Sequence, residues 1–167
     1  MKSMAAMLTV SLLAACTSYS GRGLVPGDAE LAEVIRVMGE PALRWQYPDG
    51  SVQLAFPRGP AGFHTFVARI GPDGKLQRIE NVLETKSFMQ ILPGMTESQV
   101  LQVLGPPYPA WTSYFERRDE RAWQWHYCDG SQAAAFFTVL FDGTARTVRS
   151  TMSVPESCGK ANCWCSK

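Results

Sequence analysis

A pattern of apolar and helix-terminating residues occurs twice along the chain, and it constrains the fold more than any other feature. Residues 27–41 and residues 94–107 each carry apolar side chains at helical spacing. Each segment ends in a glycine followed two residues later by a proline, as Gly39 with Pro41 and Gly105 with Pro107. Glycine and proline in these places end helices, so each segment predicts one short amphipathic helix.

The two helices are predicted to begin at different kinds of cap. Asp28 is a plausible N-cap for the first helix, because its side chain can accept a hydrogen bond from the first turn. Thr96 and Gln99 fit a capping box at the start of the second helix. Six residues past each terminating glycine stands a tryptophan, Trp45 in one copy and Trp111 in the other.

After each helix the apolar residues alternate, which indicates antiparallel strands with one buried face. The alternating sets are Val52, Leu54, Phe56; Phe66, Ala68, Ile70; Trp123, Trp125, Tyr127; and Phe137, Val139, Phe141. The fold class is therefore α+β, with two tandem helix-plus-antiparallel-sheet units at residues 27–83 and 94–152. About 60 residues bury little surface alone, so we expect the units to pack together around one core. Gly39 should superpose on Gly105, and each tryptophan should enter its first strand and cover its own helix.

The N-terminus has the organisation of an export signal. Lys2 precedes an apolar segment, residues 4–13, which is about half as long as the ~20 residues that a membrane-spanning helix needs. Leu13-Ala14-Ala15-Cys16 resembles the bacterial lipobox, in which cleavage falls before a cysteine that then carries lipid. The resemblance therefore implies that residues 1–15 are a lipoprotein signal peptide and that Cys16 is the lipidation site, and we expect residues 16–26 to be a Gly-rich lipidated tether.

The lipobox resemblance implies several acyl chains, palmitate among them, on one residue. Two or more chains anchor a protein stably to a membrane without spanning it. Thr17 follows the cysteine, where an aspartate usually retains lipoproteins of this type in the inner membrane, so the resemblance favours the outer membrane. We expect a lipid anchor in the outer membrane and a domain that faces the periplasm.

Four further cysteines, Cys128, Cys158, Cys163 and Cys165, predict two disulfides in an exported chain. A bond between Cys163 and Cys165 would close a very small, strained loop. Two pairings remain open: Cys128–Cys163 with Cys158–Cys165, or Cys128–Cys165 with Cys158–Cys163. Either holds the Cys-rich tail, residues 153–167, to the domain. The alternative is a metal site with His126, Cys128 and the tail cysteines as ligands.

The charge and the motifs exclude several classes of function. The full sequence has 16 basic and 15 acidic side chains. Loss of Lys2 with the signal peptide leaves 15 of each, so nucleic acid is not expected as a partner. No nucleophile elbow or zinc-protease motif occurs, and the glycine-rich loops lack the residues of a phosphate site. His64 and His126 are interpreted as surface or hydrogen-bonded strand residues. We therefore expect no catalytic residue, no metal, no cofactor and no small-molecule substrate.

Aromatic residues are the best candidates for a binding surface, because Trp and Tyr give large contact areas with few rotors. Most should lie in the core. The candidates for partner binding are Trp111, Tyr114, Trp123 and Trp125.

The motif from Gly94 to Pro107, Gly-Met-Thr-x-x-x-Val-x-x-x-Leu-Gly-x-Pro, resembles the signature of the SmpA/OmlA (BamE-like) outer-membrane lipoprotein family. The aromatic segments 123–127 and 136–143 and the lipobox fit the same family. The resemblance covers about residues 25–152, with a more divergent first copy. The duplication and the cysteine tail depart from a single-domain BamE-like protein. A tandem pair of such units is also similar in fold to β-lactamase inhibitor proteins.

The resemblance implies a non-enzymatic scaffold anchored to the outer membrane, with envelope proteins such as the β-barrel assembly machinery as partners. One alternative is a periplasmic inhibitor-like binding protein. The other is a thiol- or metal-handling lipoprotein based on the tail cysteines.

Overall fold

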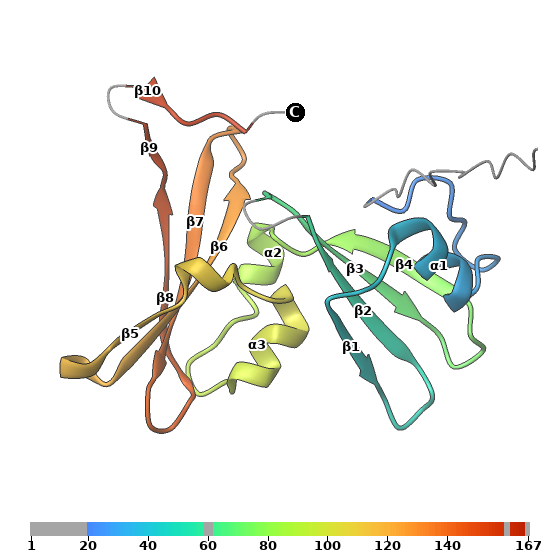
Figure 1. Ribbon diagram of the computed structural model, residues 1–167, viewed down its shortest axis with the longest axis horizontal. Helices are drawn as coiled ribbons and strands as arrows, with labels where there is room; N and C mark the ends of the chain where they lie inside the picture. The colour runs from blue at the N-terminus through green and yellow to red at the C-terminus, as the bar shows by residue number, and fades with distance from the viewer. Residues whose placement is uncertain (1–19, 59–61, 159–160, 166–167) are drawn as a thin grey trace, which may run out of the picture.

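The computed structural model describes residues 20–58, 62–158 and 161–165. The predicted signal peptide, Cys16 and the start of the tether lie outside these residues. Two antiparallel four-stranded sheets and a few short helices make up the fold (Figure 1). The predicted α+β class is confirmed. No helix in the described part of the chain is long and apolar enough to cross a membrane.

The first half of the chain forms one helix and one sheet. Sheet 1 has the strand order β1-β2-β3-β4, and its neighbouring strands are antiparallel. The elements are α1 (Leu31–Met38), β1 (Leu43–Gln46), β2 (Val52–Pro57), β3 (Thr65–Ile70) and β4 (Leu76–Asn81).

The second half repeats this order with additions. Sheet 2 has the order β5-β6-β7-β8, again antiparallel throughout. Its strands are β5 (Ser113–Phe115), β6 (Glu120–Cys128), β7 (Ala134–Asp142) and β8 (Val148–Pro155). The helices are α2 (Thr85–Phe88), α3 (Glu97–Leu104) and the 3-10 helices η1 (Pro109–Trp111) and η2 (Glu116–Arg118). The tail adds a two-stranded pair, β9 (Ser157–Cys158) and β10 (Ala161–Asn162).

Sheet 1 is covered on both faces, because α1 lies on its outer side and α2 and α3 lie between the two sheets (Figure 1). Val34 and Met38 of α1 pack on one face. Ala55 and Val67 belong to a separate apolar cluster of the sheet. All residues of β2 except its last are therefore buried, and the prediction of one buried face is wrong for this strand.

The apolar interior is divided rather than shared. The largest cluster joins Val100 and Leu104 of α3 to the inner face of sheet 2, including Trp125 and Phe141. The cluster around α1 and the one containing Ala55 are separate from it. The expectation of one common core is wrong, because α3 stands between the two sheets and divides the apolar side chains.

The two long helices end in the same way. Gly39 follows α1 with φ 86° and ψ −170°, and its N–H donates to the carbonyl of Ile35 at 2.8 Å. Gly105 follows α3 with φ 71° and ψ −172°, and its N–H donates to the carbonyl of Leu101 at 2.8 Å. This backbone region is open essentially to glycine alone, which explains the glycine at both helix ends.

The starts of the two helices are also tied to their sheets by matching backbone contacts. Glu30 bridges Lys75 just before β4, and Thr96 bridges Thr147 just before β8. Thr96 and Gln99 form the predicted capping box. The predicted cap at Asp28 is wrong: Glu30 is the N-cap and makes no side-chain cap, because its carboxylate pairs with Lys75.

The two tryptophans are not equivalent in the structure. Trp45 lies in β1 and packs on the cluster of Ala55 and Val67, not on the cluster of α1. Trp111 ends η1 and precedes the first strand of sheet 2. The prediction that both enter a first strand and cover their own helix is therefore wrong. The three prolines that surround Tyr108 favour irregular and 3-10 backbone, and this delays the strand.

Gly105→Ala is expected to lower the free energy of unfolding by about 2–4 kcal/mol. Its backbone is strained for alanine, and a Cβ would lie 2.7 Å from Thr65 Cγ2 in sheet 1. Gly94→Ala is the matched control, since Gly94 has φ +88° and open space at its Cβ. Urea denaturation should show a smaller loss for the control, about 1–2 kcal/mol. Equal losses would contradict a tight contact between α3 and sheet 1.

Candidate functional site

A cavity of about 460 Å³ opens where the two units meet. The first unit supplies the start of β3 and the segment around Leu83, and the second supplies the chain between α3 and β5 together with β6. The side chains that define it are His64, Leu83, Tyr108, Trp111, Trp125 and His126, with Pro106, Pro107 and Pro109. Small-molecule pockets commonly have volumes of about 300–1,000 Å³.

The segment after α3 is placed by local chemistry. Gly105 ends the helix and the prolines at 106 and 107 prevent it from continuing. Tyr108 then donates its N–H to the carbonyl of Gln124 on β6 at 3.4 Å. The short η1 begins at Pro109, so the segment runs beside the part of β6 that β5 does not cover.

Two tryptophans form much of the wall. Trp111 packs its ring edge-on against Tyr108 and Phe136, with centroids 4.6 and 5.1 Å away. Trp125 is buried and donates its indole N–H to the carbonyl of Gly105 at 3.3 Å. Because the polar atom of Trp125 is already bonded, its ring presents apolar surface to the cavity.

The electrostatic character of the cavity is neutral. No Asp, Glu, Lys or Arg side chain lines it among the described residues. Burial lowers the pKa of His64 below its ordinary value of 6.5, and the charge of Arg58 lowers it further. Both effects favour the uncharged form of the His64 imidazole. A charged ligand would lose its hydration here without gaining a partner charge, so the cavity suits neutral, apolar groups.

His126 also lines the cavity, and its imidazole lies within a group of aromatic side chains. Its imidazole stacks on Phe136 at 4.7 Å, and Phe63 and Trp111 lie 4.2 and 5.5 Å away. Its Nε2 meets Glu156 Oε2 at 3.1 Å. It faces away from the cluster that contains Trp125, as the strand alternation predicted. The pair with Glu156 links this wall to the C-terminal tail.

A second cavity, of about 400 Å³, lies between sheet 1 and the α2–α3 segment and has polar walls. Arg69 Nη1 donates to Gln53 Oε1 at 2.7 Å, and Gln53 Nε2 donates to the carbonyl of Gln102 in α3 at 2.6 Å. Glu80 lies within ion-pair distance of Arg69, and also of Arg78. These bonds hold α3 against sheet 1, so we interpret this cavity as part of the contact between the units.

The structure brings together two of the four aromatic residues predicted to bind a partner. Trp111 and Trp125 both line the apolar cavity. Trp123 is buried in the core of the second unit, away from the cavity. Tyr114 is 51% exposed on β5, and its hydroxyl donates to Asp119 Oδ1 at 2.7 Å. The prediction grouped four residues that the fold places in three environments.

Several cavity residues were not identified from the sequence. The prolines at 106, 107 and 109 form a cluster beside Tyr108, and this cluster is the one local signal that could have indicated a rigid, apolar wall. His64 and Leu83 carry no such signal, because they reach the cavity only through the packing of the two units.

The cysteines pair in one of the two predicted ways. Cys128 bonds Cys165, and Cys158 bonds Cys163. In this oxidised state the tail offers no thiolate ligand to a metal. The strand β8 continues to Pro155 and so includes the first three residues of the predicted tail.

Comparisons of the chain with models of known families, with curated proteins and with solved structures gave no match.

Proposed function

We propose that the protein is a lipid-anchored, non-enzymatic scaffold that binds another protein of the bacterial envelope. Its two units would be tandem SmpA/OmlA (BamE-like) units, carried by Cys16 on the outer membrane and facing the periplasm. The β-barrel assembly machinery is the partner that this family assignment favours. The motif of Gly94 to Pro107, the lipobox and the repeated helix ends at Gly39 and Gly105 support the assignment.

The apolar cavity between the units is the observation that carries the binding role. It is open, neutral and walled by Trp, Tyr and Pro side chains. Pockets of this composition receive the apolar anchor residues that dominate protein–protein affinity. The partner should therefore insert a neutral apolar segment between the two units.

Trp111→Ala tests this role directly. With a photo-crosslinking residue in place of Tyr108, the partner is first identified in cells that make the full lipoprotein. We then expect Trp111→Ala to weaken purified partner binding at least about tenfold, because it removes a wall of the cavity. Isothermal titration measures the affinity, and a thermal melt checks that the variant remains folded.

Tyr114→Ala is the matched control, since Tyr114 is aromatic and exposed but does not line the cavity. Its affinity should stay within about twofold of wild type. If Tyr114→Ala weakens binding and Trp111→Ala does not, the binding surface is the β5 region and the cavity proposal is wrong. A captured enzyme whose activity falls on binding would favour the inhibitor alternative instead.

A further inference from the structure

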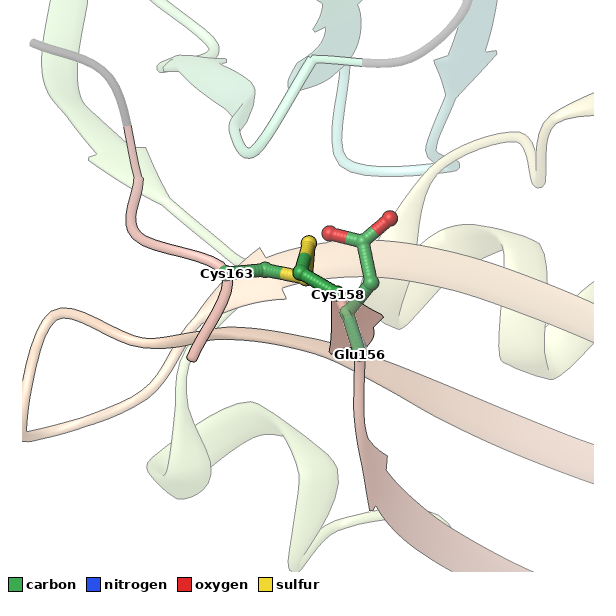
Figure 2. Close-up of side chains that lie close together, drawn as sticks. All are labelled: Glu156, Cys158 and Cys163. Carbon is green, nitrogen blue, oxygen red and sulfur yellow. A yellow bond between two sulfur atoms is a disulfide. The ribbon is translucent and has the colours of Figure 1, made fainter. Parts of the chain in front are cut away.

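The C-terminal tail gathers metal-ligating side chains at a place that the apolar cavity does not use. Glu156 follows β8, Cys158 ends β9 and Cys163 follows β10. Their carboxylate oxygen and sulfur atoms all lie within 4.8 Å of one another. Figure 2 shows the carboxylate and the disulfide directed toward the same space.

The backbone fixes these positions without help from the Cys158–Cys163 bond. Glu156 donates its N–H to the carbonyl of Ala134 at 2.8 Å, and Ala134 donates its own N–H to the carbonyl of Cys163 at 2.6 Å. The Cys128–Cys165 disulfide holds the end of the tail to β6. Opening the Cys158–Cys163 bond would therefore leave Glu156 and Cys163 anchored to the first residue of β7.

The two disulfides also differ in access. Cys158 is exposed although its partner Cys163 is buried, whereas neither Cys128 nor Cys165 is exposed. Exposed disulfides are the ones that reductants reach and open first. A reductant of limited strength should thus open Cys158–Cys163 and leave Cys128–Cys165 closed.

The carboxylate at this place is already oriented. His126 Nε2 meets Glu156 Oε2 at 3.1 Å, and the imidazole is held among aromatic rings. Carboxylate ligands are usually fixed in this way by a second hydrogen-bonding group. His126 is therefore a positioning residue for Glu156.

We propose that Cys158, Cys163 and Glu156 form a Zn²⁺-type metal site that exists only when the Cys158–Cys163 disulfide is reduced. Two thiolates and one carboxylate are a donor set that zinc accepts, with a water in the fourth position. The three ligands lie outside the apolar cavity, and His126, which lines that cavity and meets Glu156, is the one described residue that the two sites share.

A dithiol supplies the two electrons that open the site. Its thiolate attacks Sγ of Cys158, and the sulfur of Cys163 leaves as a thiolate. The second thiol of the reductant then breaks the mixed disulfide, which leaves the reductant oxidised to a disulfide and both cysteines reduced. Zinc binding displaces the proton of each remaining thiol.

The test uses the mature chain with Cys16→Ser, so that no fifth thiol contributes. A mild dithiol treatment followed by thiol counting should give two free thiols per chain. Chelator competition should then show one Zn²⁺ per chain for the reduced protein and none for the oxidised protein. Substitution by Co²⁺ should give a thiolate charge-transfer absorption.

Substitutions at three residues of the site, with Glu40→Gln as the control, separate this site from general thiol binding. Glu156→Gln should weaken Zn²⁺ binding at least about tenfold, and Glu40→Gln, an exposed glutamate elsewhere, should not. His126→Gln keeps an N–H donor and should lose less affinity than His126→Ala. Cys158→Ser should abolish stoichiometric binding.

Two results would overturn the proposal. The first is equal Zn²⁺ affinity of the reduced wild type and its Glu156→Gln variant. The second is equal binding by oxidised and reduced protein. Reduction could also abolish the cooperative thermal unfolding transition of the protein. In that case, return of the transition on addition of Zn²⁺ supports the site, and its continued absence contradicts the site.

Discussion

Cys16→Ser is expected to abolish the lipid-anchored mature form and to give a soluble or an unprocessed form instead. This follows from the proposed lipidation, because the cysteine thiol is the acceptor of the diacylglycerol and serine cannot replace it. Each buried methylene of an acyl chain contributes about 0.8 kcal/mol, so loss of all chains removes the whole anchoring energy.

Membrane flotation and mass spectrometry of the mature N-terminus measure this effect. Thr17→Ser is the matched control, because it changes the next residue and leaves Leu13-Ala14-Ala15-Cys16 intact. It should float with the membranes like the wild type. An unmodified Cys16 on the mature wild-type protein would contradict the lipoprotein proposal and, with it, the outer-membrane location.

Those parts of the fold that depend on local chemistry were predictable from the sequence. The capping box of Thr96 and Gln99 is a contact within one helical turn, and both of its hydrogen bonds are present at 3.3 and 2.8 Å. The glycine ends of α1 and α3 depend on the backbone of a single residue, Gly39 or Gly105. Alternating apolar residues likewise predicted the strands of sheet 2, including β6 with Trp125.

Features that depend on packing between the units were not predictable. Both faces of β2 are buried because α3 covers the side opposite α1. The sequence of residues 52–57 gives no sign that a distant helix packs there. Asp28 has the chemistry of a cap, but the pairing of Glu30 with Lys75 sets the helix start two residues later.

The candidate site shows the same division. Trp111 and Trp125 were candidates because of their residue type alone, and type does not distinguish them from the buried Trp123. Which tryptophan lines the cavity depends on where the prolines after α3 place the chain relative to sheet 1. The very small loop that a Cys163–Cys165 bond would close excluded one of the three possible disulfide connectivities. The structure then places Cys158 close to Cys163, because strands β9 and β10 are hydrogen-bonded to each other.

Removing the Cys128–Cys165 disulfide is expected to lower the free energy of unfolding by about 4 kcal/mol. The bond closes a loop with a sequence separation of 37 residues, and a loop of this length gives about 4 kcal/mol from the entropy of the unfolded chain. The double variant Cys128→Ser with Cys165→Ser avoids free thiols. Urea denaturation of the oxidised protein measures the loss.

The double variant Cys158→Ser with Cys163→Ser is the matched comparison. Its loop has a sequence separation of 5, for which the same relation gives only about 2 kcal/mol. The larger loss of unfolding free energy should therefore follow removal of Cys128–Cys165. In that variant the tail beyond β8 should also become the first site of proteolysis. If removal of Cys158–Cys163 instead lowers the free energy of unfolding more, the short loop holds the tail on sheet 2, and the link to β6 does not. In that case the tail would not stay in place when Cys158–Cys163 is reduced, and the metal-binding arrangement of Glu156 and the two cysteines would lose its support.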